Sequence, residues 1–199
     1  MSRPIVLILG SSGFIGQAIQ RELNAKYDLI SVDLNPNAFN EASSIAHHIV
    51  DQGNPDQVER LLSALKPYAA QLAGVIHLTA YYDFRNKADK RYTQLEETFP
   101  QLLEGLDALL PAGRPILHSS SMAAMEPTEP GSPLLASSPR IGSWAYPQHK
   151  LRMERIIESL DLNRPMAELV LAGVYSDRAE LVPLYQQIER IRRLRPEAL

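Results

Sequence analysis

Short apolar runs alternate with amphipathic stretches along most of this chain, and this alternation limits the folds that it can adopt. The first run, residues 5–9, contains only isoleucine, valine and leucine and ends at Gly10. Such a run is too short for a helix and is typical of a strand buried on both faces. Similar runs predict five further strands, at residues 29–32, 46–50, 74–78, 115–118 and 167–171. Apolar residues at helical spacing predict five helices, at residues 14–26, 54–65, 87–110, 146–160 and 184–194.

Strands that alternate with helices favour a parallel sheet with right-handed crossovers. We therefore expect a Rossmann-type doubly wound α/β fold in three layers, with six strands in the order 3-2-1-4-5-6. No shift in composition marks a boundary, so residues 1–199 are expected to form a single domain. Asn54 and Pro55 have the residue types of a helix cap and first helical position. Pro100 is expected to break or kink the helix at 87–110.

The composition argues against several classes of protein. A net charge of −3 argues against nucleic-acid binding, which normally requires a basic excess. The chain has no cysteine, which excludes disulfides and thiolate catalysis, and its histidines form no metal-ligating set with acidic residues. No run approaches the ~18 apolar residues of a membrane span, and the N-terminus shows no signal-peptide cleavage site. We expect a cytoplasmic protein that binds no membrane and no metal.

Three glycines in the segment GSSGFIG lie between the first predicted strand and the helix that follows it. Glycines at such positions permit a tight turn, the close approach of a pyrophosphate and the packing of helix against strand. The helix N-terminus adds unpaired N–H groups and partial positive charge. We therefore expect this loop to bind a dinucleotide, the alternative being a purely structural turn. The residues expected to contact the dinucleotide are Gly10, Ser12, Gly13, Phe14, Ile15 and Gly16.

Asp33 ends the second predicted strand, close to the ~20-residue spacing expected for an acid that holds a ribose 2′-hydroxyl. A carboxylate repels a 2′-phosphate, and no lysine or arginine adjoins Asp33. The sequence therefore favours NAD over NADP. The alternative is a solvated aspartate at the end of a strand.

The order of these motifs resembles that of the extended short-chain dehydrogenase/reductase family, the NAD-dependent epimerase/dehydratase group. The matching segments are GSSGFIG, VIHLTA at 75–80, SSS at 119–121, YPQHK at 146–150 and LAGVY at 171–175, together with Asp33 and Asp51. The resemblance implies that Asp51 contacts the adenine and that Leu78, Thr79 and Ala80 pass beside the adenosine ribose and the nicotinamide. It also implies that Val174 lies near the carboxamide.

Tyr146 and Lys150 lie four residues apart in a predicted helix and so share a face. Tyrosine ordinarily titrates near pH 10, and a neighbouring ammonium together with the positive nicotinamide ring favours its phenolate. The resemblance implies that Tyr146 exchanges the substrate proton and that Ser121 anchors the substrate oxygen, with Ser120 as the second choice. Tyr146 and Lys150 are also expected to contact the nicotinamide ribose. The alternatives are a surface pair on an amphipathic helix and serines that cap a strand.

The sequence departs from the family at two places. The helix after the fourth strand has LEETFP at 95–100 where the family usually has an asparagine and a glycine. The chain also ends soon after Tyr175, where family members continue into most of their substrate domain. We therefore expect residues 176–199 to form a vestigial or truncated substrate region. Tyr81, Tyr82 and Phe84 are expected either to line a substrate pocket or simply to pack.

These patterns leave two hypotheses about function. The first is an NAD-dependent oxidoreductase or epimerase that transfers hydride reversibly at a carbinol or sugar carbon of a small molecule, for which a nucleotide sugar is one choice. The second is a non-catalytic NAD(P)-binding module, a sensor or scaffold without a full substrate domain. In either case the chain is a candidate to form a homo-oligomer.

Overall fold

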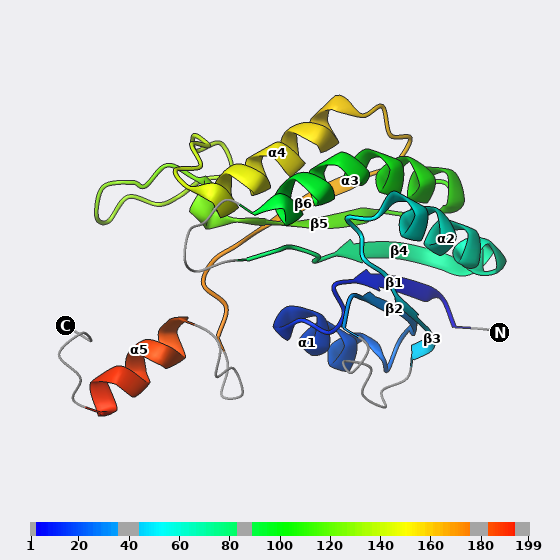
Figure 1. The fold of residues 1–199 in the computed structure, drawn as a ribbon, viewed down its shortest axis with the longest axis horizontal. Helices are drawn as coiled ribbons and strands as arrows, with labels where there is room; N and C mark the ends of the chain where they lie inside the picture. Colours follow the sequence, from blue (N-terminus) through cyan, green and yellow to red (C-terminus); the bar gives the residue numbers. More distant parts are fainter. Residues whose placement is uncertain (1–2, 36–43, 83–88, 176–182, 194–199) are drawn as a thin grey trace.

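The computed structural model describes residues 3–35, 44–82, 89–175 and 183–193, and most of them form one sheet with helices on both faces (Figure 1). The strands are β1 (Ile5–Leu9), β2 (Asp28–Asp33), β3 (Ser44–Ile49), β4 (Leu72–His77), β5 (Ile116–Ser121) and β6 (Met166–Leu171). Their order is β3-β2-β1-β4-β5-β6, and every neighbouring pair is parallel. This confirms the predicted Rossmann-type fold and strand order.

The helices lie on opposite sides of the sheet. Helix α1 (Phe14–Leu23) lies against one face, whereas α2 (Pro55–Leu65), α3 (Lys90–Leu109) and α4 (Ala145–Ser159) lie on the other (Figure 1). Two short 3-10 helices, η2 (Lys66–Gln71) and η3 (Met122–Ala124), follow α2 and β5, and α5 (Pro183–Arg192) is the last described element. None of the described helices combines the length and the apolar character needed to cross a bilayer.

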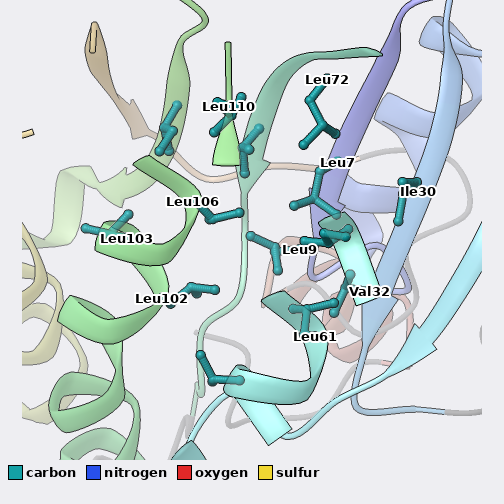
Figure 2. Packing of buried hydrophobic residues seen from close by; sticks show 14 of the residues in the cluster. Leu7, Leu9, Ile30, Val32, Leu61, Leu72, Leu102, Leu103, Leu106 and Leu110 are labelled. Carbon is teal, nitrogen blue, oxygen red and sulfur yellow. The ribbon is translucent and has the colours of Figure 1, made fainter. Parts of the chain in front are cut away.

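The core lies between the sheet and the helix layer formed by α2, α3 and α4. All five residues of β1 are buried, as expected for a central strand of a parallel sheet. Leu7 and Leu9 of β1 belong to the same buried cluster as Leu102 and Leu106 of α3 (Figure 2). The continuous apolar run that predicted the first strand therefore becomes the centre of the sheet.

Helix α2 begins where the sequence predicts. The side chain of Asn54 accepts hydrogen bonds from the backbone N–H groups of Asp56, at 3.1 Å, and Gln57, at 3.2 Å. Pro55 occupies the first helical position, where its missing N–H leaves no hydrogen bond unmade. The cap therefore fixes the start of α2 at the end of the loop that follows β3.

Helix α3 corrects the expectation that Pro100 breaks the helix, whereas the alternative of a kink at Pro100 stays a prediction. The helix runs without interruption from Lys90 to Leu109. An internal proline removes one backbone hydrogen bond and costs ~3 kcal/mol, but Phe99 and Leu103 beside it are almost completely buried. The burial of such side chains, worth about 1.5–3 kcal/mol each, offsets that cost.

The proposed substrate region is only partly described. Residues 176–182 and 194–199 lie outside the described residues, as does Phe84, and α5 is the part of the region that the structure describes. The expectation of a truncated substrate region therefore stays a prediction.

Candidate active site

A groove crosses the carboxyl ends of the strands near β1 and β4. At this point the strand order reverses, because β2 and β3 lie on one side of β1 whereas β4, β5 and β6 lie on the other. It consists of two cavities of about 400 and 540 Å³. Gly10, Gly13, Leu78 and Ala80 line both cavities, so the two adjoin at the glycine loop. Open α/β sheets bind ligands at such a point.

The glycine loop is required by the backbone itself. Gly10 has a φ of +82°, and a Cβ there would lie 2.9 Å from the backbone nitrogen of Thr79. A Cβ on Gly16 would lie 2.7 Å from the carbonyl oxygen of Ser11. Gly13 precedes α1 and has no side chain that caps the helix. The first N–H groups of α1 therefore face the groove without a side-chain cap, which suits the binding of an anion.

We expect Gly16→Ala to lower the free energy of unfolding by about 1–3 kcal/mol, because its methyl group overlaps backbone atoms that cannot move aside cheaply. Gly13→Ala is the matched control, since a Cβ there meets only the Gly10 carbonyl oxygen, at 3.4 Å. Urea unfolding of both variants measures the difference. Equal stability of the two variants would contradict the tight packing of α1 on the loop.

The first cavity is lined by both acids that the sequence singles out. The carboxylate of Asp33 accepts hydrogen bonds from the backbone N–H groups of Ser12, at 2.8 Å, and Asn35, at 3.0 Å. Asp51 lies across the cavity and accepts from the N–H of Gly53 at 2.9 Å. Asp33 thus ties the glycine loop to the end of β2 and presents negative charge to the cavity.

Thr79, which follows β4, has a polar partner in the loop after β3. The side-chain amide of Gln52 donates to Thr79 Oγ1 at 2.6 Å, and the Thr98 hydroxyl of α3 donates to the Gln52 carbonyl oxygen. Gln52 is buried and lines the first cavity. The sequence analysis missed Gln52, because no local pattern relates it to Thr79.

The second cavity is lined by Ser121, Tyr146 and Lys150, together with Phe14, Ile15 and Val174. The side chains of Ser121 and Tyr146 are hydrogen-bonded. Lys150 Nζ donates to the carbonyl oxygen of Ser119 at 2.7 Å and lies 6.0 Å from the centre of the Tyr146 ring. The structure therefore brings the three side chains from β5 and α4 to one wall of the groove.

Ser120 has a different neighbour. Its hydroxyl donates to the buried carboxylate of Glu154, which also accepts from Arg140 at 2.8 Å. Ser120 is thus engaged by α4, whereas Ser121 is bonded to Tyr146. This arrangement favours Ser121 over Ser120 as the serine that works with Tyr146.

Burial shifts the pKa values of Tyr146 and Lys150 in opposite directions. It raises the pKa of Tyr146 above its usual value of 10.0, although the hydrogen bond with Ser121 works against this. It lowers the pKa of Lys150 to about 8, with the nearby charge of Glu154 opposing the change. Tyr146 is therefore a neutral phenol near pH 7, and Lys150 alone does not produce the predicted phenolate.

An unpredicted polar pair joins α3 to α4 behind this wall. The Glu96 carboxylate lies 2.7 Å from His149 Nδ1 and also accepts from Arg152 Nε at 2.7 Å. Burial lowers the pKa of His149 despite the neighbouring Glu96, so His149 is neutral near pH 7 and donates its Nδ1–H. Glu96 lies in the segment at 95–100 that departs from the family. Its bonds connect α3 to α4, the helix that contains Tyr146 and Lys150.

Two more buried histidines lie side by side in neighbouring strands, His77 in β4 and His118 in β5. His77 and His118 face each other with their Nδ1 atoms 2.9 Å apart. Burial lowers the pKa of His77 to about 3, and that of His118 also falls well below its usual value. Both are therefore neutral near pH 7. The part of the chain that the structure describes contains no group of three histidines or acids placed to hold a metal ion.

A model of the NAD dependent epimerase/dehydratase family matches residues 6–189 of the chain. A comparison with curated protein sequences finds no match. The remaining similarities are to solved structures.

Three solved structures illustrate the shared fold. WbmG of Bordetella bronchiseptica in complex with NAD is 16% identical with a TM-score of 0.74, over 96% of this chain and 60% of that one. The UDP-glucuronic acid 4-epimerase of Bacillus cereus, in complex with UDP-glucuronic acid and NAD, is 18% identical with a TM-score of 0.71, over 95% and 63%. The ADP-L-glycero-D-manno-heptose-6-epimerase of Helicobacter pylori is 18% identical with a TM-score of 0.72, over 89% and 57%.

At these identities the likeness shows the fold alone. The chain spans about three fifths of the length of these structures. The matched part contains the sheet and the groove described above.

Proposed function

Because the chain belongs to the NAD dependent epimerase/dehydratase family, we propose that it binds NAD in the groove and transfers hydride reversibly at a carbinol or sugar carbon. The observation that carries this proposal is that the two cavities adjoin at the glycine loop. One contains the glycine loop and Asp33, and the other contains Ser121, Tyr146 and Lys150. A dinucleotide that lies along the groove has one end beside the acid and the other beside the phenol.

The residues of the groove fit a dinucleotide. A pyrophosphate would rest on the backbone of the glycine loop and the N-terminus of α1. The absence of a Cβ on Gly10 and Gly16 lets this loop pack closely against the backbone of its own neighbours. Asp33 would accept from the adenosine ribose, and Asp51 would contact the adenine. Residues 78–80 would pass beside the adenosine ribose and nicotinamide, with Val174 beside the carboxamide. Tyr146 and Lys150 would reach the nicotinamide ribose.

The chemistry of the protein itself is proton transfer. When bound, NAD accepts a hydride from the carbinol carbon, and the carbinol becomes a carbonyl group. Tyr146 would take the hydroxyl proton as the phenolate, which a positive nicotinamide ring and Lys150 would favour together, and in the reverse direction it would give the proton back as the neutral phenol. Ser121 holds the substrate oxygen beside the Tyr146 hydroxyl, and the buried charge of Lys150 favours the phenolate. For an epimerase, Tyr146 would return the proton to the same substrate oxygen after the carbonyl group has turned its opposite face to the cofactor.

Titration with NAD and NADP tests the cofactor assignment. We expect NAD to bind at least tenfold more tightly than NADP, a difference of about 1.4 kcal/mol, because Asp33 repels a 2′-phosphate. Asp33→Asn should reduce this preference and weaken NAD binding, and its single side-chain oxygen can still accept from one of the two backbone amides, that of Ser12 or that of Asn35. An unchanged preference in this variant, or tighter binding of NADP by the parent, would show that Asp33 does not select the cofactor.

The substrate that we propose is a small molecule, and nucleotide sugars are the first class to assay, since the Bacillus cereus structure holds UDP-glucuronic acid. The second candidate function is a non-catalytic NAD-binding module. It is favoured by the burial of Tyr146, which raises the pKa of the phenol and so opposes the phenolate that proton transfer requires. NAD binding without turnover of any carbinol would support this second function. Gel filtration with light scattering tests the proposed homo-oligomer.

A further inference from the structure

Two aromatic rings, those of Tyr82 and Trp144, pack beside the ring of Tyr146. The rings of Tyr82 and Tyr146 are almost perpendicular, at 84°, with centres 4.6 Å apart. Trp144 lies 5.7 Å from Tyr146 and 6.0 Å from Tyr82. Such edge-to-face contacts are worth about 0.5–1.5 kcal/mol each beyond simple burial. The rings therefore hold one another in place at the mouth of the second cavity.

The surface that surrounds these rings is apolar. Tyr82 and Met122 line the cavity and keep 41% and 38% of their surface exposed. Ala123, Leu171 and Val174 complete the same wall. A concave site with exposed aromatic and aliphatic surface is typical of a site that takes an apolar part of a ligand.

The same wall offers no accessible positive charge from the residues that the structure describes. Lys150 is the one charged residue among those that line the second cavity. Its ammonium is buried and donates to the Ser119 carbonyl oxygen. Among the lining residues that the structure describes, no exposed cationic side chain would therefore replace the water that an anionic group beside the reacting carbon loses, and that loss costs free energy.

We propose that this cavity takes a substrate whose reacting carbon is attached to an uncharged ring with an apolar face. The ring lies against Tyr82 and Met122, and Trp144 acts as a positioning residue that supports Tyr82 and Tyr146 from behind. This inference rests on the proposed function and names the substrate class of the same site. It sets such substrates above open-chain alcohols and above those with a carboxylate next to the carbinol.

Trp144 provides a direct measurement, because the chain has a single tryptophan and so one indole N–H resonance. The NAD-bound protein is titrated with acetophenone, with phenylglyoxylate, in which a carboxylate replaces the methyl group, and with 2-butanone, which lacks the ring. We expect acetophenone to shift the resonance with an affinity at least tenfold above either of the other two. Equal or tighter binding of phenylglyoxylate or 2-butanone, or no saturable shift with acetophenone, overturns the proposal.

Tyr82→Leu tests the ring contact, because it replaces the aromatic ring with an aliphatic side chain. We expect the affinity for acetophenone to fall at least fivefold. Tyr185→Leu is the matched control, since Tyr185 lies on α5 and lines neither cavity. Full acetophenone affinity in Tyr82→Leu overturns the contact. Titration of the parent protein with NAD separates the two proposals. If NAD does not bind, the proposed function is contradicted. If NAD binds but acetophenone binds no more tightly than 2-butanone, this inference alone is contradicted.

Discussion

Tyr146→Phe is expected to lower kcat by about 10²- to 10⁴-fold, the range typical of losing a positioned acid–base group. The variant removes only the hydroxyl, so the ring keeps its contacts with Tyr82 and Trp144. NAD affinity should fall by less than tenfold, because most of the expected cofactor contacts lie elsewhere in the groove. Stopped-flow or steady-state formation of NADH measures the first effect, and NAD titration measures the second.

The control for this variant is Tyr68→Phe, which removes a hydroxyl from η2, away from the residues that line the groove. We expect it to keep full turnover. If Tyr146→Phe also keeps full turnover, Tyr146 is not the acid–base group. If both variants bind NAD and neither they nor the parent oxidise any carbinol, the non-catalytic module becomes the better hypothesis.

The sequence was sufficient for the fold because the signals for it are local. The apolar run of β1, the glycines that follow it and the cap at Asn54 each depend on neighbouring residues, and the structure has all three as predicted. Pro100 was misjudged because its cost is local, whereas the burial that offsets it involves side chains of other elements.

The candidate site was only partly predictable. Tyr146 and Lys150 were found through their helical spacing and the family resemblance, and the structure brings both to one cavity with Ser121. The contacts of Glu96 with His149 and of Gln52 with Thr79 join residues far apart in the chain. No periodic pattern records such pairs, because they form only when separate elements pack. The raised pKa of Tyr146 was missed for the same reason, since burial causes it.

Lys150→Met is expected to stabilise the protein while it abolishes turnover. Burial lowers the pKa of Lys150 from 10.5 to about 8, so the folded state holds its proton less tightly than the unfolded chain does. Below about pH 8 both states are protonated, and the full cost of the buried charge is present. Between about pH 8 and 10.5 the unfolded chain binds more protons, so the free energy of unfolding rises with pH. The pKa difference corresponds to roughly 3 kcal/mol.

Methionine keeps the apolar length of the side chain and removes this cost. We expect the free energy of unfolding at pH 7 to rise by about 1–3 kcal/mol, the lower values reflecting the Ser119 carbonyl oxygen that loses its donor. Glu154 keeps its bonds to Ser120 and Arg140, so it is not left uncompensated. Urea unfolding at pH 7 and pH 9.5 should show the gain at pH 7 and a smaller pH dependence, with the exposed Lys66→Met as control. A variant that is less stable than the parent at pH 7 would contradict the proposed cost of the buried Lys150 charge.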